Sequence, residues 1–427
     1  MASAQGAAVS HLFPLGSGVN DRGRLEVGGC DVAELARELG TPAYVYAEDD
    51  MRSRARAYLH AFRSRTERFE VVYASKALPC TAAYRLMAEE GLACDVASGG
   101  ELHLALAGGF DPARVYMHGN NKMEAVLAYA LERGVGTIVI DSFDEIDRLE
   151  RLCAGRRQAV MLRVTPGIRP STHAYVQTGQ EDSKFGFGLG EVGRATERCR
   201  AAGLDLRGLH AHIGSQVFDL GVYEALAETL AAIGDWPLLN LGGGLGIAYT
   251  AEDEPPSIDD YVEALLRNAP DGVRVLCEPG RSLVGSAGVT IYTVGTVKRI
   301  PDVRTYVAVD GGMSDNLRPM LYGARYEAAI ADRLGALGGD RSGDPGGELC
   351  TVAGMHCESG DILVRDVLLD DPRPGDVLVV PATGAYGHAM ANNYNAVPRP
   401  PVVFCRDGDA RVVVRRETLD DLTLRDV

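Results

Sequence analysis

The sequence predicts an α/β protein in which a (β/α)8 barrel of the TIM type precedes a C-terminal, mostly antiparallel β domain. Between residues 69 and 280, eight short apolar runs rich in β-branched residues alternate with helical patterns, as in a parallel barrel. After Arg281, strand-like runs follow one another with only short Gly, Asp and Pro turns between them. The composition, 46% hydrophobic and 24% charged, is that of a globular chain. An open doubly wound sheet is the alternative, which the count of eight strands disfavours.

Each predicted barrel strand ends in a small or polar residue, as strands that lead into loops commonly do. In chain order the strands are FEVVYAS (ending at Ser75), ACDVAS (Ser98), VYMHG (Gly119), TIVIDS (Ser142), AVMLRVTPG (Gly167), LRGLHAHIG (Gly214), PLLNLGGG (Gly244) and VRVLCEPG (Gly280). Stretches with helical spacing lie between most of them, such as Thr81–Glu90, Gly100–Ala107 and Met123–Arg133.

These changes of pattern divide the chain into three parts. We expect residues 1–40 to pack with the β domain, residues 41–285 to form the barrel, and residues 286–427 to form the β domain. Within the last part, only Tyr326–Leu337 has the pattern of a longer helix.

The charge and the cysteines limit the class of protein. Lys and Arg number 43 against 59 for Asp and Glu, so the net charge is −16, and we expect no nucleic-acid or membrane partner. The nine cysteines are scattered without a CxxC pair, which disfavours a disulfide framework or a zinc ribbon. The sequence has no signal-peptide pattern and no apolar run of the ~18 residues that a membrane helix needs. We therefore expect a cytoplasmic protein.

Reactive groups of such barrels lie at the carboxyl ends of the strands. The first predicted strand is followed by Lys76 and the last by Glu278. Barrel closure makes these strands neighbours, so both side chains can face one cavity. A lysine is most often a solvated surface residue, but a desolvated lysine is an amine nucleophile that forms a Schiff base with an aldehyde.

A glycine cluster, LNLGGGLG, follows the seventh strand and includes Gly243 and Gly244. It does not fit GxGxxG, because Ile247 stands in place of the third glycine, so a dinucleotide site is disfavoured. Its backbone N–H groups can approach an anion, and barrels bind phosphate after strands seven and eight, where Arg281 also lies. A plain tight turn is the alternative to this phosphate site.

Glu278 ends an apolar strand and needs a cationic or protonated partner there. A protonated pyridine nitrogen would serve, and an arginine is the structural alternative. His210 and His212 could bind a metal, but the sequence shows no third clustered ligand, so we expect none. Stacking on a flat cofactor ring suits His212 better, whereas a core role suits His210.

The β domain contributes further candidates. In CESGD, Cys357 is a candidate proton donor, and a buried spectator is the usual alternative for a cysteine. Arg318 and Tyr322 are four residues apart, so they would present a cation and a hydroxyl on one helical face. Tyr386 lies on a tight GAYG turn.

An imine-forming lysine, a carboxylate for a pyridine nitrogen and a phosphate site together indicate pyridoxal 5′-phosphate. With these features the chain resembles the fold type III, alanine-racemase-like decarboxylases, and among them the diaminopimelate decarboxylase family. The resemblance covers nearly the whole chain and rests on YASKA, THAYVQTGQEDSKFGFGL, HAHIGSQ, LGGGLG, EPGR, LRPMLYGA, CESGD and GAYG…NNYN. VVPAT and NAVPRPPVV lack acidic residues that many members have, but neither departure touches a proposed catalytic role.

The resemblance implies a role for each candidate. Lys76 would hold the cofactor and then release it to the substrate amine, His212 would stack on its ring, and Glu278 would keep its ring nitrogen protonated. Cys357, supplied by the partner subunit of a homodimer, would be the proton donor, assisted by Asp361. The phosphate and its surroundings would be held by Ser215, Gly243, Gly244, Pro279, Gly280, Arg281 and Tyr386.

The implied reaction is decarboxylation of the amino acid meso-diaminopimelate to L-lysine and carbon dioxide. The far end of this substrate carries an ammonium and a carboxylate, so the site needs both a cation and an anion. The substrate-binding residues would be Arg281, Arg318, Tyr322, Glu358 and Tyr386, with Glu358 at the distal ammonium.

Other functions on the same scaffold are decarboxylation of ornithine, arginine, lysine or a specialised amino acid, and racemisation. A protein that binds pyridoxal phosphate without catalysis is a further alternative. Arg318 and Glu358 argue against the simple basic amino acids, and Cys357 argues against a racemase or a non-catalytic carrier.

Overall fold

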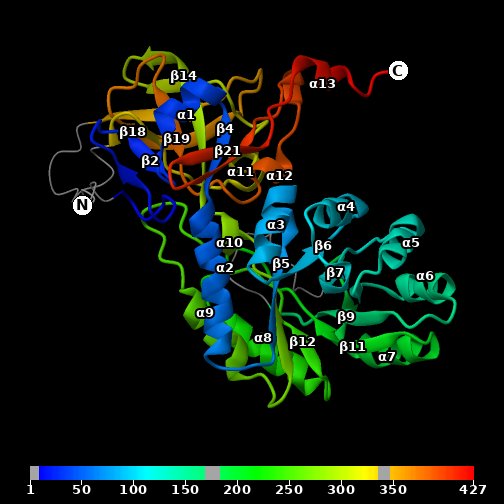
Figure 1. Cartoon of the computed structure of the whole chain (residues 1–427). Helices are drawn as coiled ribbons and strands as arrows, with labels where there is room; N and C mark the ends of the chain where they lie inside the picture. The colour runs from blue at the N-terminus through cyan, green and yellow to red at the C-terminus, as the bar shows by residue number, and fades with distance from the viewer. Residues whose placement is uncertain (1–8, 169–182, 335–346) are drawn as a thin grey trace. The chain divides into compact units, whose positions relative to one another are not determined.

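The computed structural model describes residues 9–168, 183–334 and 347–427, and its contacts divide the chain into two compact units (Figure 1). The barrel unit comprises Arg52–Gly246 and Pro255–Ser282. The β unit comprises the described parts of Met1–Met51, Ile247–Glu254 and Leu283–Val427. In the described ranges, no helix has both the length and the apolar character needed to cross a bilayer.

Eight parallel strands close into a ring in the barrel unit. They are β5 (Phe69–Ala74), β6 (Ala93–Val96), β7 (Val115–Met117), β8 (Thr137–Ile140), β9 (Ala159–Thr165), β11 (Asp205–His210), β12 (Leu238–Asn240) and β13 (Arg274–Cys277). Each strand pairs with the next, and β13 pairs with β5, which confirms the predicted barrel. A short strand, β10 (Phe187–Gly188), extends the sheet beside β9.

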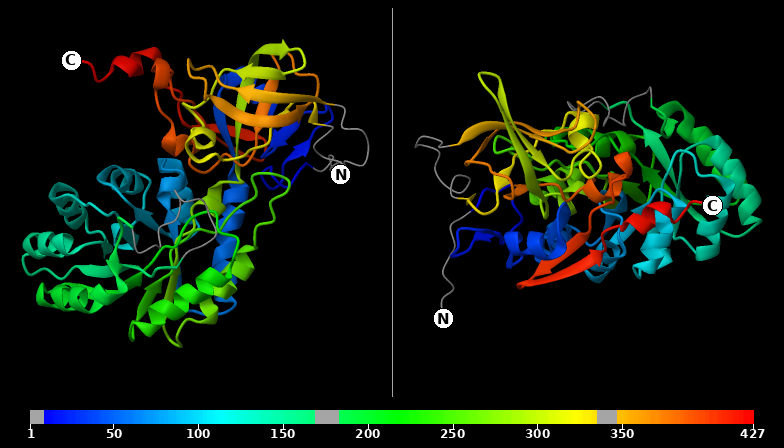
Figure 2. Two further views of the ribbon diagram at one scale, coloured as in Figure 1. Left: turned by 180° about the vertical axis from the view of Figure 1, so that it is seen from behind. Right: turned by 90° about the horizontal axis from the view of Figure 1, so that it is seen from above.

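Helices follow the strands and lie outside the ring (Figure 2). They are α3 (Thr81–Glu89), α4 (Gly99–Ala107), α5 (Glu124–Arg133), α6 (Phe143–Cys153), α7 (Val192–Ala201), α8 (Gly221–Ala232) and α9 (Ile258–Arg267), with α2 (Glu48–Arg63) before β5 and α10 (Arg281–Val284) after β13. Serine caps fix where some of them begin, since the hydroxyls of Ser98 and Ser257 accept backbone N–H bonds at 3.1 and 3.0 Å. α5 ends at Gly134, whose left-handed conformation (φ 74°) costs a glycine little.

The interior of the barrel is a packed core and not a channel. Seven of the eight strands each give one buried apolar side chain to a single cluster, namely Val72, Ala93, Tyr116, Val139, Met161, Leu238 and Leu276. Because this layer is filled, the carboxyl ends of the strands are where polar groups can gather around a ligand.

The β unit is built on one sheet in the order β18-β17-β15-β14-β4-β20-β21, with β19 beside β14 and β16 beside β19. The strands are β4 (Ala43–Ala47), β14 (Gly288–Ile300), β15 (Arg304–Val309), β16 (Ala329–Ile330), β17 (Glu348–Ala353), β18 (Ile362–Leu369), β19 (Val377–Val380), β20 (Val402–Arg406) and β21 (Asp409–Val414). Only the described pairs β15–β17 and β4–β20 are parallel, so the mostly antiparallel prediction is confirmed. Its helices are α11 (Arg318–Tyr322), α12 (Gly387–Met390) and α13 (Leu419–Thr423).

The N-terminal segment belongs to the β unit. It forms a small antiparallel sheet of β1 (Gly18–Val19), β2 (Leu25–Val27) and β3 (Cys30–Asp31), followed by α1 (Val32–Leu39). The carboxylate of Asp31 caps α1 by accepting the N–H of Ala33 at 2.9 Å. Apolar side chains of this segment share one core with those of β4, β14, β19 and β20.

Two sequence expectations differ from the structure. Residues 41–51, 247–254 and 283–285 were assigned to the barrel, but they lie in the β unit. For the first of these segments the reason is that β4 pairs with β14 and β20, partners that local periodicity cannot reveal. The described part of the expected helix at Tyr326–Leu337 contains no α-helix. Ala329–Ile330 pairs with β19 instead, so tertiary pairing decided this segment.

Candidate active site

Every barrel strand carries a polar or charged residue within two residues of its carboxyl end. From β5 to β13 these residues are Lys76, Asp95, His118, Asp141, Arg163, His210, Asn240 and Glu278. All except Lys76 are buried. Because buried polar groups are costly unless they are paired, this ring of residues marks the carboxyl end of the barrel as the candidate active site.

Lys76 lies in a single 3-10 turn, Ser75–Ala77, that begins where β5 ends. The Ser75 N–H donates to the carboxylate of Asp95 at 3.2 Å, which fixes the turn to the neighbouring strand. The flanking residues of the turn are buried, whereas Lys76 is exposed. Lys76 is near enough for its charge to lower the pKa values of Asp95 and His212.

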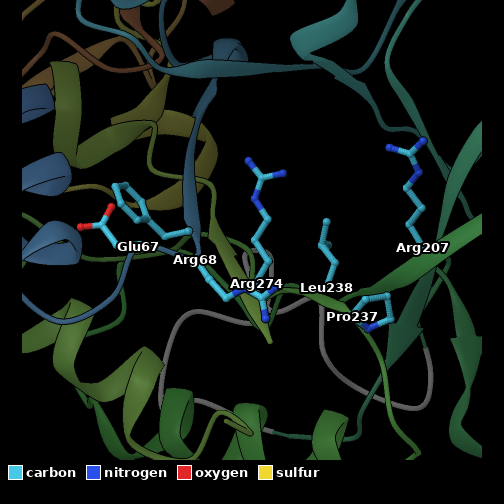
Figure 3. A pocket seen from close by; sticks show the side chains of 7 residues that line it. Glu67, Arg68, Arg207, Pro237, Leu238 and Arg274 are labelled. Atoms are coloured by element: carbon cyan, nitrogen blue, oxygen red, sulfur yellow. The ribbon is translucent and has the colours of Figure 1, made fainter. Parts of the chain in front are cut away.

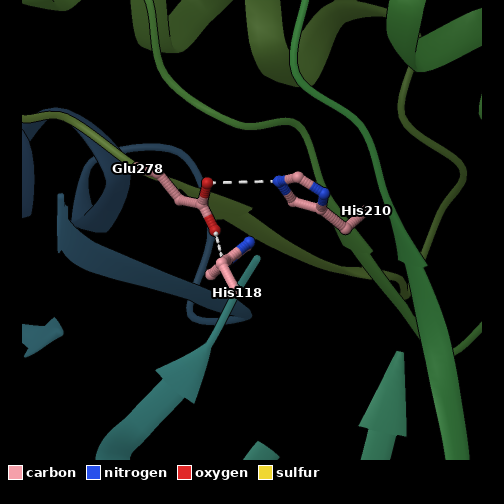
Figure 4. Close-up of side chains that lie close together, drawn as sticks. All are labelled: His118, His210 and Glu278. Atoms are coloured by element: carbon pink, nitrogen blue, oxygen red, sulfur yellow. Dashed lines mark hydrogen bonds and ion pairs between the residues drawn. The ribbon is translucent and has the colours of Figure 1, made fainter. Parts of the chain in front are cut away.

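Glu278 is the centre of a buried polar cluster (Figure 4). Its Oε1 lies 2.8 Å from Nε2 of His118 and accepts a bond from Nδ2 of Asn240 at 2.7 Å. Its Oε2 lies 3.2 Å from Nε2 of His210. The amide of Asn240 has a defined orientation, because its Oδ1 accepts the N–H of Gly242 at 3.0 Å and its Nδ2 must therefore donate to Glu278.

These contacts determine the charge of the site. Burial opposes ionisation of Glu278, but the imidazoles of His118 and His210 outweigh it and hold the pKa of this carboxyl well below its usual value. Burial lowers the pKa of His210 to about 4, so a neutral imidazole lies beside Glu278 at neutral pH. Burial, followed by the charge of Glu278, raises the pKa of Asp95 to about 7. The site thus holds an ionised Glu278 near an Asp95 carboxyl that titrates near neutrality.

The same cluster bears on the prediction that no metal binds. His118, His210 and Glu278 offer three ligand atoms within 4.8 Å of one another, a set of the kind that can hold a metal ion. The sequence pattern pointed only to His210 and His212 as candidate ligands, and His118 and Glu278 come from other strands. His212 is not part of the set, and an amide N–H from Asn240 already reaches the carboxylate.

His212 lies past the end of β11, and the glycine turn holds its ring. The Gly243 N–H donates to Nδ1 of His212 at 3.2 Å, so the ring carries its proton on Nε2. Burial, and then the charge of Lys76, holds the pKa of His212 well below its usual value, so the ring is neutral. The N–H groups of Gly242 and Gly243, which the sequence analysis assigned to an anion, are thus already engaged, with Asn240 and His212.

Close backbone contacts require glycine at two positions of this turn. A Cβ at Gly243 would lie 2.0 Å from the carbonyl oxygen of Glu278, and a Cβ at Gly244 would lie 2.3 Å from that of Gly214. Gly244 also has a positive φ of 117°, which side chains of L-residues rarely adopt.

The turn after β13 brings a cation to the site. The Pro279 carbonyl accepts the N–H of Ala74 at 3.0 Å, which ties this turn to the end of β5. A Cβ at Gly280 would lie 2.9 Å from Ala74, so the turn approaches β5 closely. Arg281 donates from Nη2 to the hydroxyl of Ser215 at 2.7 Å. A guanidinium and a hydroxyl offered together suit a phosphate.

In the β unit, Cys357 lies on the turn between β17 and β18. It is exposed, whereas the other eight cysteines are buried. The Cys357 N–H donates to Oδ1 of Asn395 at 3.2 Å. The carboxylate of Asp361 accepts the N–H groups of His356 at 2.9 Å and Met313 at 2.7 Å. Since both oxygens of Asp361 bind the backbone, this residue shapes the turn, on which the exposed Glu358 also lies.

Arg318 begins α11 and is buried among tyrosines. Its guanidinium carbon lies 4.6 Å from the ring centroid of Tyr249 and 5.5 Å from that of Tyr326, and its Nη1 donates to the Tyr326 hydroxyl. Tyr386, in the left-handed region with φ 67°, is near enough to act on its charge. Within the described part of the chain, no carboxylate forms an ion pair with Arg318. Tyr322 lies half-buried at the other end of α11.

A cavity of about 470 Å³ lies at the opposite, amino end of the barrel strands (Figure 3). It is lined by Glu67, Arg68, Phe69, Arg207, Pro237, Leu238 and Arg274. Two of its arginines already form ion pairs with nearby carboxylates. Asp205 lies 2.9 Å from Arg207, and Glu70 lies 3.3 Å from Arg274. Because barrels of this type react at the carboxyl ends of their strands, this cavity is not the candidate active site.

The strands of the barrel lie within a stretch of the chain that matches a known family. Residues 48–285 match the family model described as pyridoxal-dependent decarboxylase, pyridoxal binding domain. The chain is 46% identical over 430 residues to the diaminopimelate decarboxylase of Bacillus subtilis, an alignment that covers 96% of each protein. The chain belongs to the diaminopimelate decarboxylase family.

Two further relatives extend the comparison. The diaminopimelate decarboxylase of Actinosynnema pretiosum is 48% identical over 434 residues, which cover 97% of this chain and 95% of that protein. The crystal structure of diaminopimelate decarboxylase from M. jannaschii in co-complex with L-lysine has a TM-score of 0.87 at 32% identity, and the match covers 96% of this chain and 97% of that one. The resemblance therefore extends over both units.

The residues suggested by the family resemblance come together within each unit. In the barrel, His212 and Gly243 share a hydrogen bond, as do Ser215 and Arg281. In the β unit, Arg318 and Tyr386 interact. Residues 172–182, which make up much of the THAYVQTGQEDSKFGFGL motif, lie outside the described residues.

Five of the strand-end residues were missed by the sequence analysis, namely Asp95, His118, Asp141, Arg163 and Asn240. Each lies in a strand that the sequence predicts, but only His118 and Asp141 stand next to the predicted strand end, in VYMHG and TIVIDS. The rule that selected Lys76 and Glu278 would have found these two had it been applied to every strand. Their partners, in contrast, could not be read from the sequence, since each comes from another strand.

Proposed function

We propose that this member of the diaminopimelate decarboxylase family removes carbon dioxide from meso-2,6-diaminopimelate to give L-lysine, with pyridoxal 5′-phosphate as cofactor. The observation that carries the proposal is the buried, ionised Glu278 in a barrel whose first strand leads into Lys76. A buried, ionised carboxylate is suited to stabilise a protonated ring nitrogen. Relatives that are named diaminopimelate decarboxylase match this chain over nearly their full length, which supports the proposed substrate.

The chain's own residues fit this cofactor. When bound, pyridoxal phosphate accepts the electron pair that is released as carbon dioxide leaves. Lys76 would hold it through the ε-amine, and the neutral ring of His212, fixed by Gly243, would stack on it. Its phosphate and surroundings would be held by Ser215, Gly244, Pro279, Gly280, Arg281 and Tyr386, whereas Gly243 would act through His212, which accepts its N–H.

Arg318 supports a substrate with a carboxylate at its far end. It is a buried cation whose described partners are tyrosines, so its charge is available to an anionic ligand. Arg281, Tyr322 and Tyr386 would complete the carboxylate-binding set, and Glu358 would bind the distal ammonium. Ornithine and lysine decarboxylation would require no such cation, because those substrates end in an ammonium alone.

Cys357 is the proposed proton donor to the carbon that loses carbon dioxide. It is the exposed cysteine of the chain, on a turn held by Asn395 and Asp361. We place it in the site of the partner subunit, so that a homodimer carries two shared sites. Nine free cysteines, eight of them buried, support a reducing compartment such as the cytoplasm.

The decisive experiment measures carbon dioxide release by the purified protein loaded with pyridoxal phosphate. Meso-diaminopimelate is compared with L-ornithine, L-arginine and L-lysine, and the product is identified. We expect strong preference for meso-diaminopimelate and stoichiometric L-lysine. A preference for ornithine or arginine would overturn the substrate assignment, and silence on all four with the cofactor bound would indicate a specialised amino acid.

A further inference from the structure

The guanidinium of Arg318 is held by two tyrosines, Tyr249 and Tyr326. The proposed reaction assigns neither of them a direct role. Tyr249 belongs to Ile247–Glu254, a segment that follows the glycine turn after β12 but is part of the β unit. Tyr326 lies between α11 and β16. Both rings are buried in one apolar cluster, edge to face, with 5.2 Å between their centroids. Arg318 therefore packs against two buried tyrosine rings that also pack against each other.

The backbone that carries these tyrosines is itself tied in place. The N–H groups of Tyr249 and Thr250 donate to the carboxylate of Asp253 at 2.9 and 2.8 Å. The N–H of Ala251 donates to Oε1 of Glu327, the residue after Tyr326, at 2.6 Å. Glu327 thus links the two tyrosine-bearing segments, which fixes the two rings relative to each other.

A guanidinium is flat and recognises a carboxylate with two parallel N–H bonds, so the orientation of its plane decides how well it binds. The ring of Tyr249 lies within cation–π distance of Arg318, and the hydroxyl of Tyr326 accepts one of its five N–H groups. No other described residue accepts a hydrogen bond from Arg318, so its remaining N–H groups are left for a ligand.

We infer that Tyr249 and Tyr326 are positioning residues that, through Arg318, set the selectivity for a substrate with a carboxylate at its far end. This inference rests on the proposed function and names two residues on which its substrate choice depends. Neither tyrosine is assigned a contact with the reacting atoms.

The chemistry of the reaction supplies a pair of probes. Decarboxylation at one end of meso-diaminopimelate leaves a product, L-lysine, that keeps the carboxylate of the other end, whereas cadaverine lacks both carboxylates. The experiment measures KM and kcat for meso-diaminopimelate and the inhibition constants of L-lysine and cadaverine. Tyr326→Phe removes only a hydroxyl, Tyr249→Leu removes a ring, and Tyr249→Phe keeps that ring.

We expect Tyr326→Phe and Tyr249→Leu to raise KM and the L-lysine inhibition constant together by about tenfold, as for the loss of a contact that orients a charged group. The kcat and the cadaverine constant should stay near wild type, because neither depends on the distal carboxylate. Tyr249→Phe should behave as wild type. Tyr306→Phe, which changes a half-buried tyrosine of β15, is the matched control for loss of a hydroxyl.

Arg318→Ala distinguishes a failure of the tyrosine roles from a failure of the proposed function. If Arg318→Ala weakens L-lysine binding but Tyr326→Phe and Tyr249→Leu do not, the inference about the tyrosines is wrong and the proposed function stands. If Arg318→Ala also binds L-lysine as wild type does, the role of Arg318 in the proposed function fails and the inference fails with it. Should Tyr249→Leu melt far below wild type, Tyr326→Phe alone decides.

Discussion

Two histidines that stand two residues apart have different roles because their rings meet different partners. His210, at the end of β11, bonds to the carboxylate of Glu278 at 3.2 Å, whereas His212, beyond the strand, accepts the N–H of Gly243 at 3.2 Å. Burial keeps both rings neutral by lowering their pKa values. A neutral His210 leaves the negative charge of Glu278 uncancelled, which a protonated ring nitrogen requires of its partner.

The assignment of the cofactor can be tested at one atom, the ε-amine nitrogen of Lys76. The chain has four lysines, so borohydride reduction of the loaded protein followed by peptide mapping can locate the attached cofactor without ambiguity. We expect the label on Lys76, and we expect Lys76→Ala to lose the visible absorption band of the bound cofactor. Lys298→Ala, at an exposed lysine of β14, should keep both signals. A label on another lysine would contradict the assignment.

Cys357 separates cofactor binding from proton transfer. Because its side chain is exposed and lies in the β unit, Cys357→Ala should keep the cofactor band and the melting temperature. Turnover should fall by about 10²–10⁴-fold, the contribution typical of a positioned acid. Steady-state rates and absorption spectra of the same sample check both parts. Turnover close to wild type would remove Cys357 from the reaction.

At the scale of elements, the ends of the strands approach one another so closely that they leave no room for side chains. Gly243→Ala would place a Cβ 2.0 Å from the carbonyl oxygen of Glu278, so the end of β13 must shift. We expect loss of cofactor binding and a lower melting temperature, measured by absorption titration and thermal unfolding. Gly190→Ala, where no atom lies within 4 Å of the added Cβ, is the control and should change neither. If Gly243→Ala bound the cofactor and melted as wild type does, this close contact would be refuted.

Glu417 anchors the segment between β21 and α13. It accepts bonds from Nε of Arg399 at 2.7 Å, the Arg399 N–H at 2.9 Å and Nδ2 of Asn393 at 2.7 Å. The side chain of Arg399, above all, lowers the pKa of Glu417 to about 2. Glu417→Gln should therefore cost about 1–3 kcal/mol of stability at pH 7, as expected for a lost charged hydrogen bond.

The pH dependence of Glu417→Gln follows from the sign of this shift. Because the folded state depresses the pKa, the stabilisation is present above the unfolded pKa of about 4.5 and is lost as the pH falls toward 2. The difference in melting temperature between wild type and Glu417→Gln should therefore shrink from pH 7 to pH 3. Glu252→Gln, at a carboxylate that is 81% exposed, should show little difference at any pH. If the difference in melting temperature between wild type and Glu417→Gln stayed constant with pH, the stabilisation would not come from the ionised Glu417 carboxylate.

At the scale of the whole molecule, the proposed homodimer can be tested by mixing inactive chains. Lys76→Ala and Cys357→Ala each remove one of the groups that we assign to different subunits of a site. Co-expressed at equal levels, they should recover about a quarter of wild-type activity, since half of the dimers are hybrids with one intact site of two. If each site is built from a single chain, no activity returns. Sedimentation of the purified protein provides the independent mass.

The sequence predicted the barrel because its signals are local. Alternating strand and helix patterns, and the small residues at the strand ends, depend only on neighbouring residues, and all eight strands were found where they were expected. The same locality explains the two errors. β4 has the pattern of a strand in either unit, and Ala329–Ile330 became a strand only because β19 lies beside it.

The sequence alone therefore determined the fold class, the cofactor and the strand ends that carry Lys76 and Glu278. Only the tertiary structure decided that His118 and Asn240 share the carboxylate of Glu278, and that Tyr249 and Tyr326 hold Arg318. The physical reason is that periodicity and turn chemistry act over a few residues, whereas a side chain's partners depend on strand order, register and packing between segments far apart in the chain.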